Sequence, residues 1–265
     1  MTPSMQSPKL LVVDSGVGGL SVARAIRKEL PELSMIYAAD YAAFPYGDWE
    51  AEALRDHLFK QISKWIEEQS PDCVVIACNT ASTLILPSLR ATFDLPFVGT
   101  VPAIKPAAAT SRTGMISVLA TPGTVKRDYT RALMQEFAKG LSVELVGSQH
   151  LAALAEHWFV SGPSEELRQK IQDELSPCFI ESQSGNKTDC VVLGCTHFPL
   201  LVDVLPILAP WPVKWVDPSP AIARRVGEVL GKKAKKCSGG TFEIISSTES
   251  RTEHVESLWV KLLLP

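Results

Sequence analysis

The sequence predicts an α/β protein built from two related domains with mainly parallel sheets. Apolar runs alternate with helical patterns along the whole chain, which is typical of βα units. A nine-residue pattern of an acid, an apolar run, a cysteine and small polar residues occurs twice, at residues 72–80 and 189–197. A weaker repeat sets residues 12–15 over residues 118–121, in the same order. We therefore expect an internal duplication whose second half restarts near residue 100.

Composition narrows the class of protein. The chain has 265 residues, a hydrophobic fraction of 46% and a net charge of −3, with acids and bases mixed. Such a balance favours neither nucleic acid nor a membrane surface as a partner. The first residues lack the apolar core of a signal peptide, and no apolar run reaches the length of a membrane span. We expect a cytoplasmic protein whose six cysteines are reduced.

The elements of the first half follow from apolar periodicity. A strand at 10–13 ends in a glycine turn, and a helix follows at 20–30. We then expect a strand at 34–39, an aromatic loop at 41–48, a helix at 50–69, the strand of the first repeat, a helix, a strand at 96–99 and a helix at 101–110. Pro87 is expected to break or restart the helix after the first repeat, because proline lacks a backbone N–H. His57 lies beside the apolar stripe of its helix and is interpreted as structural.

The second half follows the same alternation. We expect strands at 114–120, 142–146 and 214–216, the strand of the second repeat, and helices from 125, at 150–160, at 164–182 and from 217. Pro199 suits the first turn of a helix after the second repeat. Residues 231–240 are predicted to be a basic, solvated loop, and residues 241–264 a strand and a closing helix.

The turn at residues 14–19 offers an anion site. It reads Asp14-Ser-Gly-Val-Gly-Gly19, between a strand and a helix whose first N–H groups lack partners. Ser21 stands where a dinucleotide-binding fingerprint needs its third glycine, so a substrate carboxylate is favoured over a cofactor. A tight turn with a hydrogen-bonded aspartate is the structural alternative.

Four interpretations of the repeated cysteines compete. Buried core positions suit Cys73 and Cys190, which lie inside the apolar runs, but suit Cys78 and Cys195 less well because polar residues follow them. A disulfide is disfavoured by the expected compartment. A metal site of Cys78, Cys195 and His197 would need an unusual Cys-x-His spacing for zinc. Paired acid–base catalysis at one carbon is the fourth interpretation.

Paired catalysis accounts for the duplication. Inverting a carbon centre requires proton removal from one face and delivery to the other, with one cysteine as thiolate and its twin as thiol. A thiol near a helix N-terminus ionises below its usual pKa of about 8.5. Asp14 is a candidate helper for Cys78, and His197 for Cys195. The backbone amides after each cysteine and the hydroxyls of Ser15, Thr80 and Thr196 are candidate donors to a substrate carboxylate.

Four segments resemble those of the glutamate racemases, in the same order and spacing. They are residues 13–19 (VDSGVGG), 44–47 (FPYG), 77–81 (ACNTA) and 193–200 (LGCTHFPL). The resemblance runs from about residue 10 to at least residue 226. It implies racemisation of L- and D-glutamate without a cofactor, which supplies D-glutamate for peptidoglycan in the bacterial cytoplasm.

The resemblance also implies residue roles. Cys78 would act on D-glutamate and Cys195 on L-glutamate, assisted by Asp14 and His197. Substrate contacts carry over to Asp14, Ser15, Tyr46, Gly47, Cys78, Asn79, Thr80, Thr121, Cys195, Thr196 and His197. Asp40 and Glu156 fall at positions with auxiliary roles in some members.

A partner, a domain arrangement and an oligomeric state are implied as well. Residues 101–106 and 124–127 resemble members activated by a UDP-linked muramyl peptide precursor, and Lys105, Lys126 and Arg127 could bind its phosphates. The family chain crosses back, so we expect one domain of residues 1–99 plus 210–265, another of residues 100–209, and the active site in the interdomain cleft. A homodimer is common in the family.

Rival functions remain open at this point. An aspartate racemase shares the two-cysteine logic, and a non-catalytic amino-acid-binding protein could share the fold. A metal-dependent hydrolase would be sensitive to chelators.

Overall fold

The chain passes from one structural unit to a second and back again. The computed structural model describes residues 7–231, 240–248 and 251–263. The first unit is Met1–Thr100 with Ser219–Pro265, and the second is Val101–Pro218. The expected boundary at residue 210 needs correction, because the strand at Lys214–Val216 pairs within the second sheet.

The first unit contains a five-stranded sheet in the order β4-β3-β1-β2-β9, with every neighbouring pair parallel. Its strands are β1 (Lys9–Asp14), β2 (Ser34–Ala39), β3 (Cys73–Ile76), β4 (Phe97–Gly99) and β9 (Phe242–Ser246). The first four strands are almost wholly buried, which explains their continuous apolar sequences. Strand β9 comes from the tail of the chain and pairs with β2.

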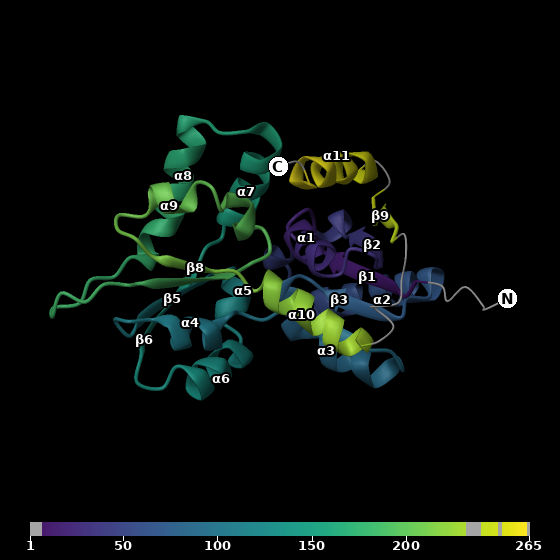
Figure 1. Ribbon diagram of the computed structural model, residues 1–265, viewed down its shortest axis with the longest axis horizontal. Helices are drawn as coiled ribbons and strands as arrows, with labels where there is room; N and C mark the ends of the chain where they lie inside the picture. The colour runs from purple at the N-terminus through teal and green to yellow at the C-terminus, as the bar shows by residue number, and fades with distance from the viewer. Residues whose placement is uncertain (1–6, 232–239, 249–250, 264–265) are drawn as a thin grey trace. The chain divides into compact units, whose positions relative to one another are not determined.

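Helices cover this sheet and are labelled in Figure 1. They are α1 (Leu20–Glu29), α2 (Ala51–Gln69), α3 (Asn79–Thr92), α10 (Ser219–Leu230) and α11 (Thr252–Leu263), with 3₁₀ turns η1 (Tyr41–Ala43) and η2 (Tyr46–Asp48). One core cluster joins α2 and α3 to alternate residues of β1, β2 and β3. Helix α1 packs against α10, and right-handed crossovers place α1 on the face opposite α2.

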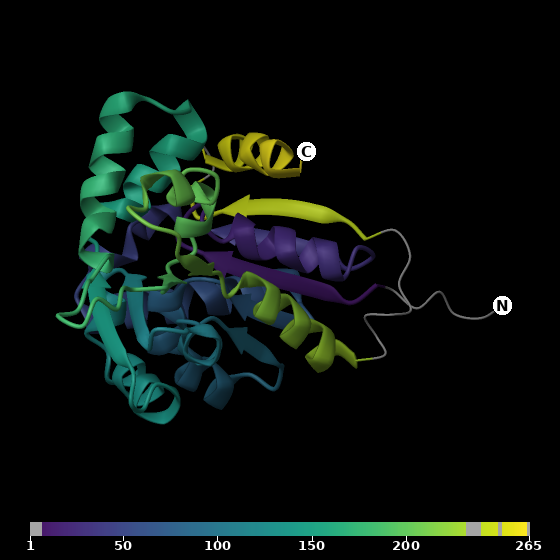
Figure 2. The ribbon, with the colours of Figure 1, turned by 60° about the vertical axis from the view of Figure 1, so that its left-hand side comes forward.

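The second unit contains a parallel four-stranded sheet in the order β6-β5-β7-β8. Its elements are α4 (Ile104–Thr110), β5 (Met115–Ala120), α5 (Pro122–Val125), α6 (Asp128–Phe137), β6 (Ser142–Gly147), α7 (Leu151–Ser161), α8 (Glu165–Leu175), η3 (Ser176–Cys178), β7 (Cys190–Gly194), η4 (Phe198–Leu201), α9 (Leu205–Leu208) and β8 (Lys214–Val216). One core cluster lies under α7, α8, η4 and α9, and the other lies under α4 and α6. Figure 2 shows the strands and helices from a second direction.

The two sheets share one topology. Read from β2, the first sheet runs β2-β1-β3-β4, and the second runs β6-β5-β7-β8, so each strand has a counterpart four places later. The registers also agree: Val13 pairs with Ile76, and their counterparts in the repeats, Leu119 and Leu193, pair with each other. Cys78 and Cys195 therefore follow equivalent strands, as the repeats predict.

The aspartate at the first position of each repeat accepts hydrogen bonds from backbone N–H groups at the start of the neighbouring strand. Asp72 accepts a hydrogen bond from the backbone N–H of Lys9, at the first residue of β1. Asp189 accepts from the N–H groups of Arg112 and Thr113, just before β5, and from the hydroxyl of Ser111. The repeated acids thus have a structural role in both halves.

Three expected helices differ from the structure. Helix α3 continues through Pro87, because Ile85 and Leu89 on either side are buried in the same core, which offsets the lost hydrogen bond. The helix expected at 164–182 ends at Leu175, because Pro177 follows and a 3₁₀ turn replaces the last turns. The helix expected from Val125 divides into α5 and α6.

Other expectations concern the end of the chain. In place of the helix predicted after the second repeat, the structure has the 3₁₀ turn η4, followed by the short helix α9. Pro199 lies in the first positions of η4. Most of the predicted loop at 231–240 lies outside the described residues. No helix in the described part of the chain is long and apolar enough to cross a membrane.

Candidate active site

In the first unit, the predicted residues gather where β1, β2 and β3 end. Strand β1 ends at Asp14, and Cys78 lies two residues beyond the end of the neighbouring strand β3. The N–H of Ala77 donates to the carbonyl of Val13, which keeps the two strand ends in register. Asp14 is fully buried, whereas Cys78 retains 9% exposure. Carboxyl ends of parallel strands are where α/β sheets place their ligands.

The glycine turn holds Asp14 from behind. Its carboxylate accepts a hydrogen bond from the N–H of Gly16, and the Tyr37 hydroxyl donates to the Gly16 carbonyl at 2.6 Å. Ser15 lies within 3.4 Å of the same carboxylate. A Cβ atom at Gly19 would lie 2.6 Å from the Cβ of Asp14, so only glycine lets helix α1 begin this close to the acid. The turn is therefore tight and contains a hydrogen-bonded aspartate, as the structural alternative predicts. The same hydrogen bond holds the Asp14 carboxylate in place.

Cys78 is the N-cap residue of α3, with an extended backbone. The first N–H groups of this helix are the positive end of its dipole, which favours a thiolate. The next residues, Asn79 and Thr80, form the first turn and are buried. Neither polar atom of the Asn79 carboxamide has a hydrogen-bond partner in the described part of the chain. A buried amide in that state has its donors and acceptor available for a ligand.

Tyr46, Asp40 and His57 form a hydrogen-bonded group next to Cys78. The Tyr46 hydroxyl donates to Oδ2 of Asp40 at 2.9 Å, and Nε2 of His57 lies 2.7 Å from the same oxygen. Tyr46 and Cys78 share one apolar cluster. Burial raises the pKa of Tyr46, and the charges of Asp40, Cys78 and Asp14 raise it further, so its phenol remains a donor.

In the second unit, His197 links Cys195 to Glu156. Nδ1 of His197 lies 3.9 Å from the sulfur of Cys195, and Nε2 lies 3.2 Å from Oε2 of Glu156. Both His197 and Cys195 are buried, with 2% and 7% exposure. Glu156 projects from α7, 41 residues earlier in the chain. A carboxylate on one imidazole nitrogen fixes which nitrogen faces the thiol.

The remaining predicted residues are placed on these same elements. Thr121 is the N-cap of α5 at the end of β5, and its hydroxyl lies 3.1 Å from that of Thr124. Thr196 is buried between Cys195 and His197. Gly47 is exposed in η2, beside Tyr46. The structure thus places Asp14, Ser15, Asp40, Tyr46, Gly47, Cys78, Asn79 and Thr80 in the first unit, and Thr121, Glu156, Cys195, Thr196 and His197 in the second.

The two halves support their thiols differently. Cys78 caps a 14-residue α-helix, whereas Cys195 precedes only the 3₁₀ turn η4 and instead has an imidazole within reach. Helix-dipole support, expected for both thiols, is therefore largely restricted to Cys78. The sequence predicts a structural role for His57, and the structure shows that its ring contacts Asp40. The two residues are 17 positions apart, and no local sequence pattern indicates this contact.

The other described cysteines belong to the core. Cys73 and Cys178 are fully buried, and burial raises the pKa of each thiol to about 12. Burial also raises the pKa of Cys190. All five described cysteines are free thiols, and Cys237 lies outside the described residues. Among the described residues, no group of three or more histidine, cysteine or carboxylate side chains is arranged to hold a metal ion.

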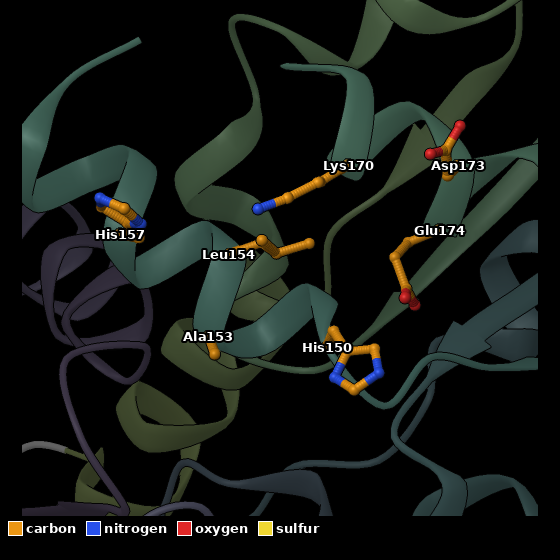
Figure 3. A pocket seen from close by; sticks show the side chains of 7 residues that line it. All are labelled: His150, Ala153, Leu154, His157, Lys170, Asp173 and Glu174. Carbon is orange, nitrogen blue, oxygen red and sulfur yellow. The ribbon is translucent and has the colours of Figure 1, made fainter. Parts of the chain in front are cut away.

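A surface pocket of about 500 Å³ lies between α7 and α8. Leu154 and His157 line it from α7, His150 lines it from just before that helix, and Lys170 and Glu174 line it from α8 (Figure 3). None of the predicted site residues lines this pocket. Glu156 lies on the same helix, α7, but its side chain contacts His197 and does not line the pocket.

Comparison with known proteins agrees with this geometry. Residues 20–226 match the family model described as Asp/Glu/Hydantoin racemase. The glutamate racemase of Agrobacterium fabrum (strain C58) is 50% identical over 241 residues, which cover 90% of this chain and 87% of the relative. That of Brucella canis is 53% identical over 222 residues, covering 83% and 79%.

A solved structure resembles the whole chain. Escherichia coli glutamate racemase, in complex with L-glutamate and the activator UDP-MurNAc-Ala, aligns with a TM-score of 0.82 and 38% identity, covering 97% of this chain and 94% of that one. With its family model, its relatives and its duplicated strand ends all in agreement, the chain belongs to the Asp/Glu/Hydantoin racemase family.

Proposed function

We propose that this chain, an isomerase that racemises glutamate, uses Cys78 and Cys195 as its two acid–base groups and needs no cofactor. The proposal rests on one observation above all: two buried thiols follow equivalent strands of two sheets with the same topology. The identity of 50–53% to glutamate racemases favours glutamate over aspartate as the substrate.

The chemistry needs one proton removed and one delivered. A thiolate takes the α-proton from one face of glutamate, leaving a carbanion whose charge spreads into the carboxylate. The opposite thiol then donates its proton to the other face, and the two sulfurs exchange protonation states. This step requires each of the two sulfurs to reach the same α-carbon, one from each face.

Each thiol receives help from its own unit. At Cys78, the amides at the start of α3 stabilise the thiolate, and Asp14 assists at the neighbouring strand end. At Cys195, His197 stabilises the thiolate as an imidazolium or accepts the thiol proton, while Glu156 holds the ring. In line with the family, Cys78 acts on D-glutamate and Cys195 on L-glutamate.

Substrate binding uses the polar groups around the thiols. Asn79 has a buried, unpartnered carboxamide, which suits the α-amino and carboxylate groups of an amino acid. Ser15, Tyr46, Gly47, Thr80, Thr121 and Thr196 complete the proposed contacts. Asp14 and His197 serve both as contacts and as helpers, and Asp40 and Glu156 are auxiliary.

The cellular role and partners follow from the activity. The product D-glutamate would enter peptidoglycan synthesis, and so cell-wall biogenesis and cell shape, in the cytoplasm. The E. coli structure contains the activator UDP-MurNAc-Ala. Lys105, Lys126 and Arg127, on α4 and between α5 and α6, are the proposed phosphate contacts for such an activator. A homodimer is the proposed assembly.

The test is a racemisation assay on the purified protein without pyridoxal phosphate. Solutions of L-glutamate, D-glutamate and L-aspartate should lose their circular dichroism signal on racemisation, which we expect for both glutamate enantiomers and to little extent for aspartate. An equal rate with aspartate would favour the aspartate racemase alternative. Binding of glutamate without any loss of signal would favour the non-catalytic alternative, and inhibition by a chelator would contradict metal-free chemistry.

A further inference from the structure

The imidazole of His57 and the carboxylate of Asp40 mirror the pair that serves Cys195. In the second unit, helix α7 follows β6 and supplies Glu156 to His197. In the first unit, helix α2 follows the equivalent strand β2 and supplies His57 to Asp40. Each half thus contains one imidazole–carboxylate pair that joins this helix to the end of a strand. The strand is β2 in the first unit and β7, the counterpart of β3, in the second.

We propose that His57 is a positioning residue for the first half-site, acting through Asp40 and Tyr46 on the surroundings of Cys78. This inference rests on the proposed two-thiol function and adds a residue to it. It does not make His57 a group that touches substrate.

The contact between His57 and Asp40 is short and one-sided. Nε2 of His57 lies 2.7 Å from Oδ2 of Asp40, whereas Oδ1 of Asp40 has no partner among the described residues. Asp40 is fully buried, so its carboxylate depends on the two donors at Oδ2. Removing one of these two donors leaves a buried negative charge with a single hydrogen bond, which costs free energy.

The contact reaches Cys78 through Tyr46. The Tyr46 hydroxyl donates to the same Oδ2 atom, so the carboxylate fixes the phenol ring by its far end. The ring packs in the apolar cluster that also contains Cys78. The charges of Asp40, Cys78 and Asp14 all raise the pKa of the Tyr46 phenol, so Tyr46 lies within electrostatic range of the first thiol.

His57 itself is held at the edge of the group. Its side chain is 25% exposed. The centroid of its ring lies 5.3 Å from that of Trp49, and the two ring planes are inclined by 39°. An aromatic replacement can therefore keep the packing while losing the N–H donor. A purely structural role for His57 predicts that such a replacement is harmless.

The variants separate hydrogen bonding from packing. His57→Phe keeps a ring against Trp49 and removes the donor, and His57→Gln restores an N–H donor without a ring. Lys60→Gln is the matched control, because Lys60 is exposed on the same helix, three residues on. Each variant is compared with the wild-type protein for melting temperature and for kcat and KM in both directions.

The second readout is selective alkylation of the two thiols. Iodoacetamide modification is followed at Cys78 and at Cys195 by peptide mass spectrometry, in the same sample. Loss of the donor leaves the charge of Asp40 less compensated, which disfavours a nearby thiolate. Cys195 lies in the other unit and serves as the internal reference.

We expect His57→Phe to lower kcat about tenfold, the effect of roughly 1.4 kcal/mol on a barrier, and to slow alkylation of Cys78 but not of Cys195. His57→Gln should recover most of both losses, and Lys60→Gln should match the wild-type protein. Wild-type kcat and an unchanged alkylation ratio in His57→Phe would overturn the inference. So would a failure of His57→Gln to recover either loss while its melting temperature equals that of His57→Phe. Failure of the wild-type protein to racemise glutamate would instead overturn the proposed function.

Discussion

Oε2 of Glu156 lies 3.2 Å from Nε2 of His197, whose other nitrogen faces the sulfur of Cys195 at 3.9 Å. Three residues from two distant segments thus form a continuous group inside the second unit. The carboxylate contacts one ring nitrogen, which leaves the other nitrogen facing the sulfur.

Replacing Glu156 by glutamine should therefore impair the second half-site selectively. We expect kcat to fall roughly 10- to 100-fold, the range for one lost hydrogen bond to a charged group of about 1.5–3 kcal/mol. Alkylation of Cys195 should slow while that of Cys78 is unchanged. Equal effects on both thiols would show that Glu156 acts on the fold as a whole. Glu165→Gln, exposed at the start of α8, is the control.

Gly19 should tolerate no side chain. In Gly19→Ala, the new Cβ would lie 2.6 Å from the Cβ of Asp14 and 2.9 Å from the Tyr37 hydroxyl, so the carboxylate must move. We expect a loss of activity of at least about tenfold, together with a destabilisation of about 1–3 kcal/mol, as for overpacking in a core. Gly227→Ala is the control, because its Cβ would meet only Leu30 at 3.7 Å. Urea unfolding and the racemisation assay give both values, and equal behaviour of the two variants would contradict the account.

Asp189 should stabilise the fold in a pH-dependent manner. Burial alone would raise its pKa, but hydrogen bonds from Ser111, Arg112 and Thr113 together lower it below the usual 3.8. A carboxyl whose pKa is lower in the folded state contributes stability that is complete above its unfolded pKa and is lost as the pH falls through the folded pKa. The wild-type protein should thus exceed Asp189→Asn in free energy of unfolding at neutral pH, with the difference shrinking below about pH 4. A difference that stays constant down to pH 3 would contradict this origin.

The core cysteines should be dispensable for catalysis. Cys73→Ala removes a fully buried thiol whose pKa is about 12, so no thiolate is lost near neutral pH. We expect kcat within about twofold of the wild-type value and a destabilisation of about 1–2 kcal/mol, typical of a small core deletion. Assays of kcat and thermal unfolding on the same preparation check both. A loss of activity as large as that of Cys78→Ala would remove the distinction between the two cysteines of the repeat.

Much of the fold could be predicted from the sequence, because buried parallel strands appear as uninterrupted apolar runs. The repeats at 72–80 and 189–197 also indicate the shared topology, since the same side chains are needed wherever the same strand is buried. Helix ends were harder to predict. Pro87 is tolerated because its neighbours are buried, and that burial is a tertiary property.

The positions of Asp14, Cys78 and Cys195 at the ends of strands were predictable, because each lies at or directly after an apolar run. Contacts between distant segments were not: His57 meets Asp40 17 residues away, and Glu156 meets His197 41 residues away. Neither pair has a local pattern. The same limit applies to η4, where one 3₁₀ turn replaces an expected helix and changes how Cys195 is supported.

Transfer of deuterium from heavy water to the α-carbon tests the two-thiol mechanism most directly. In wild-type protein, the newly formed enantiomer should carry solvent deuterium, while the remaining substrate carries none at early times. Cys78→Ser and Cys195→Ser should each lose racemisation by about 100-fold or more, the scale of general acid–base catalysis. Racemisation at the wild-type rate in either single variant, or a product that retains its original α-proton, would contradict the mechanism.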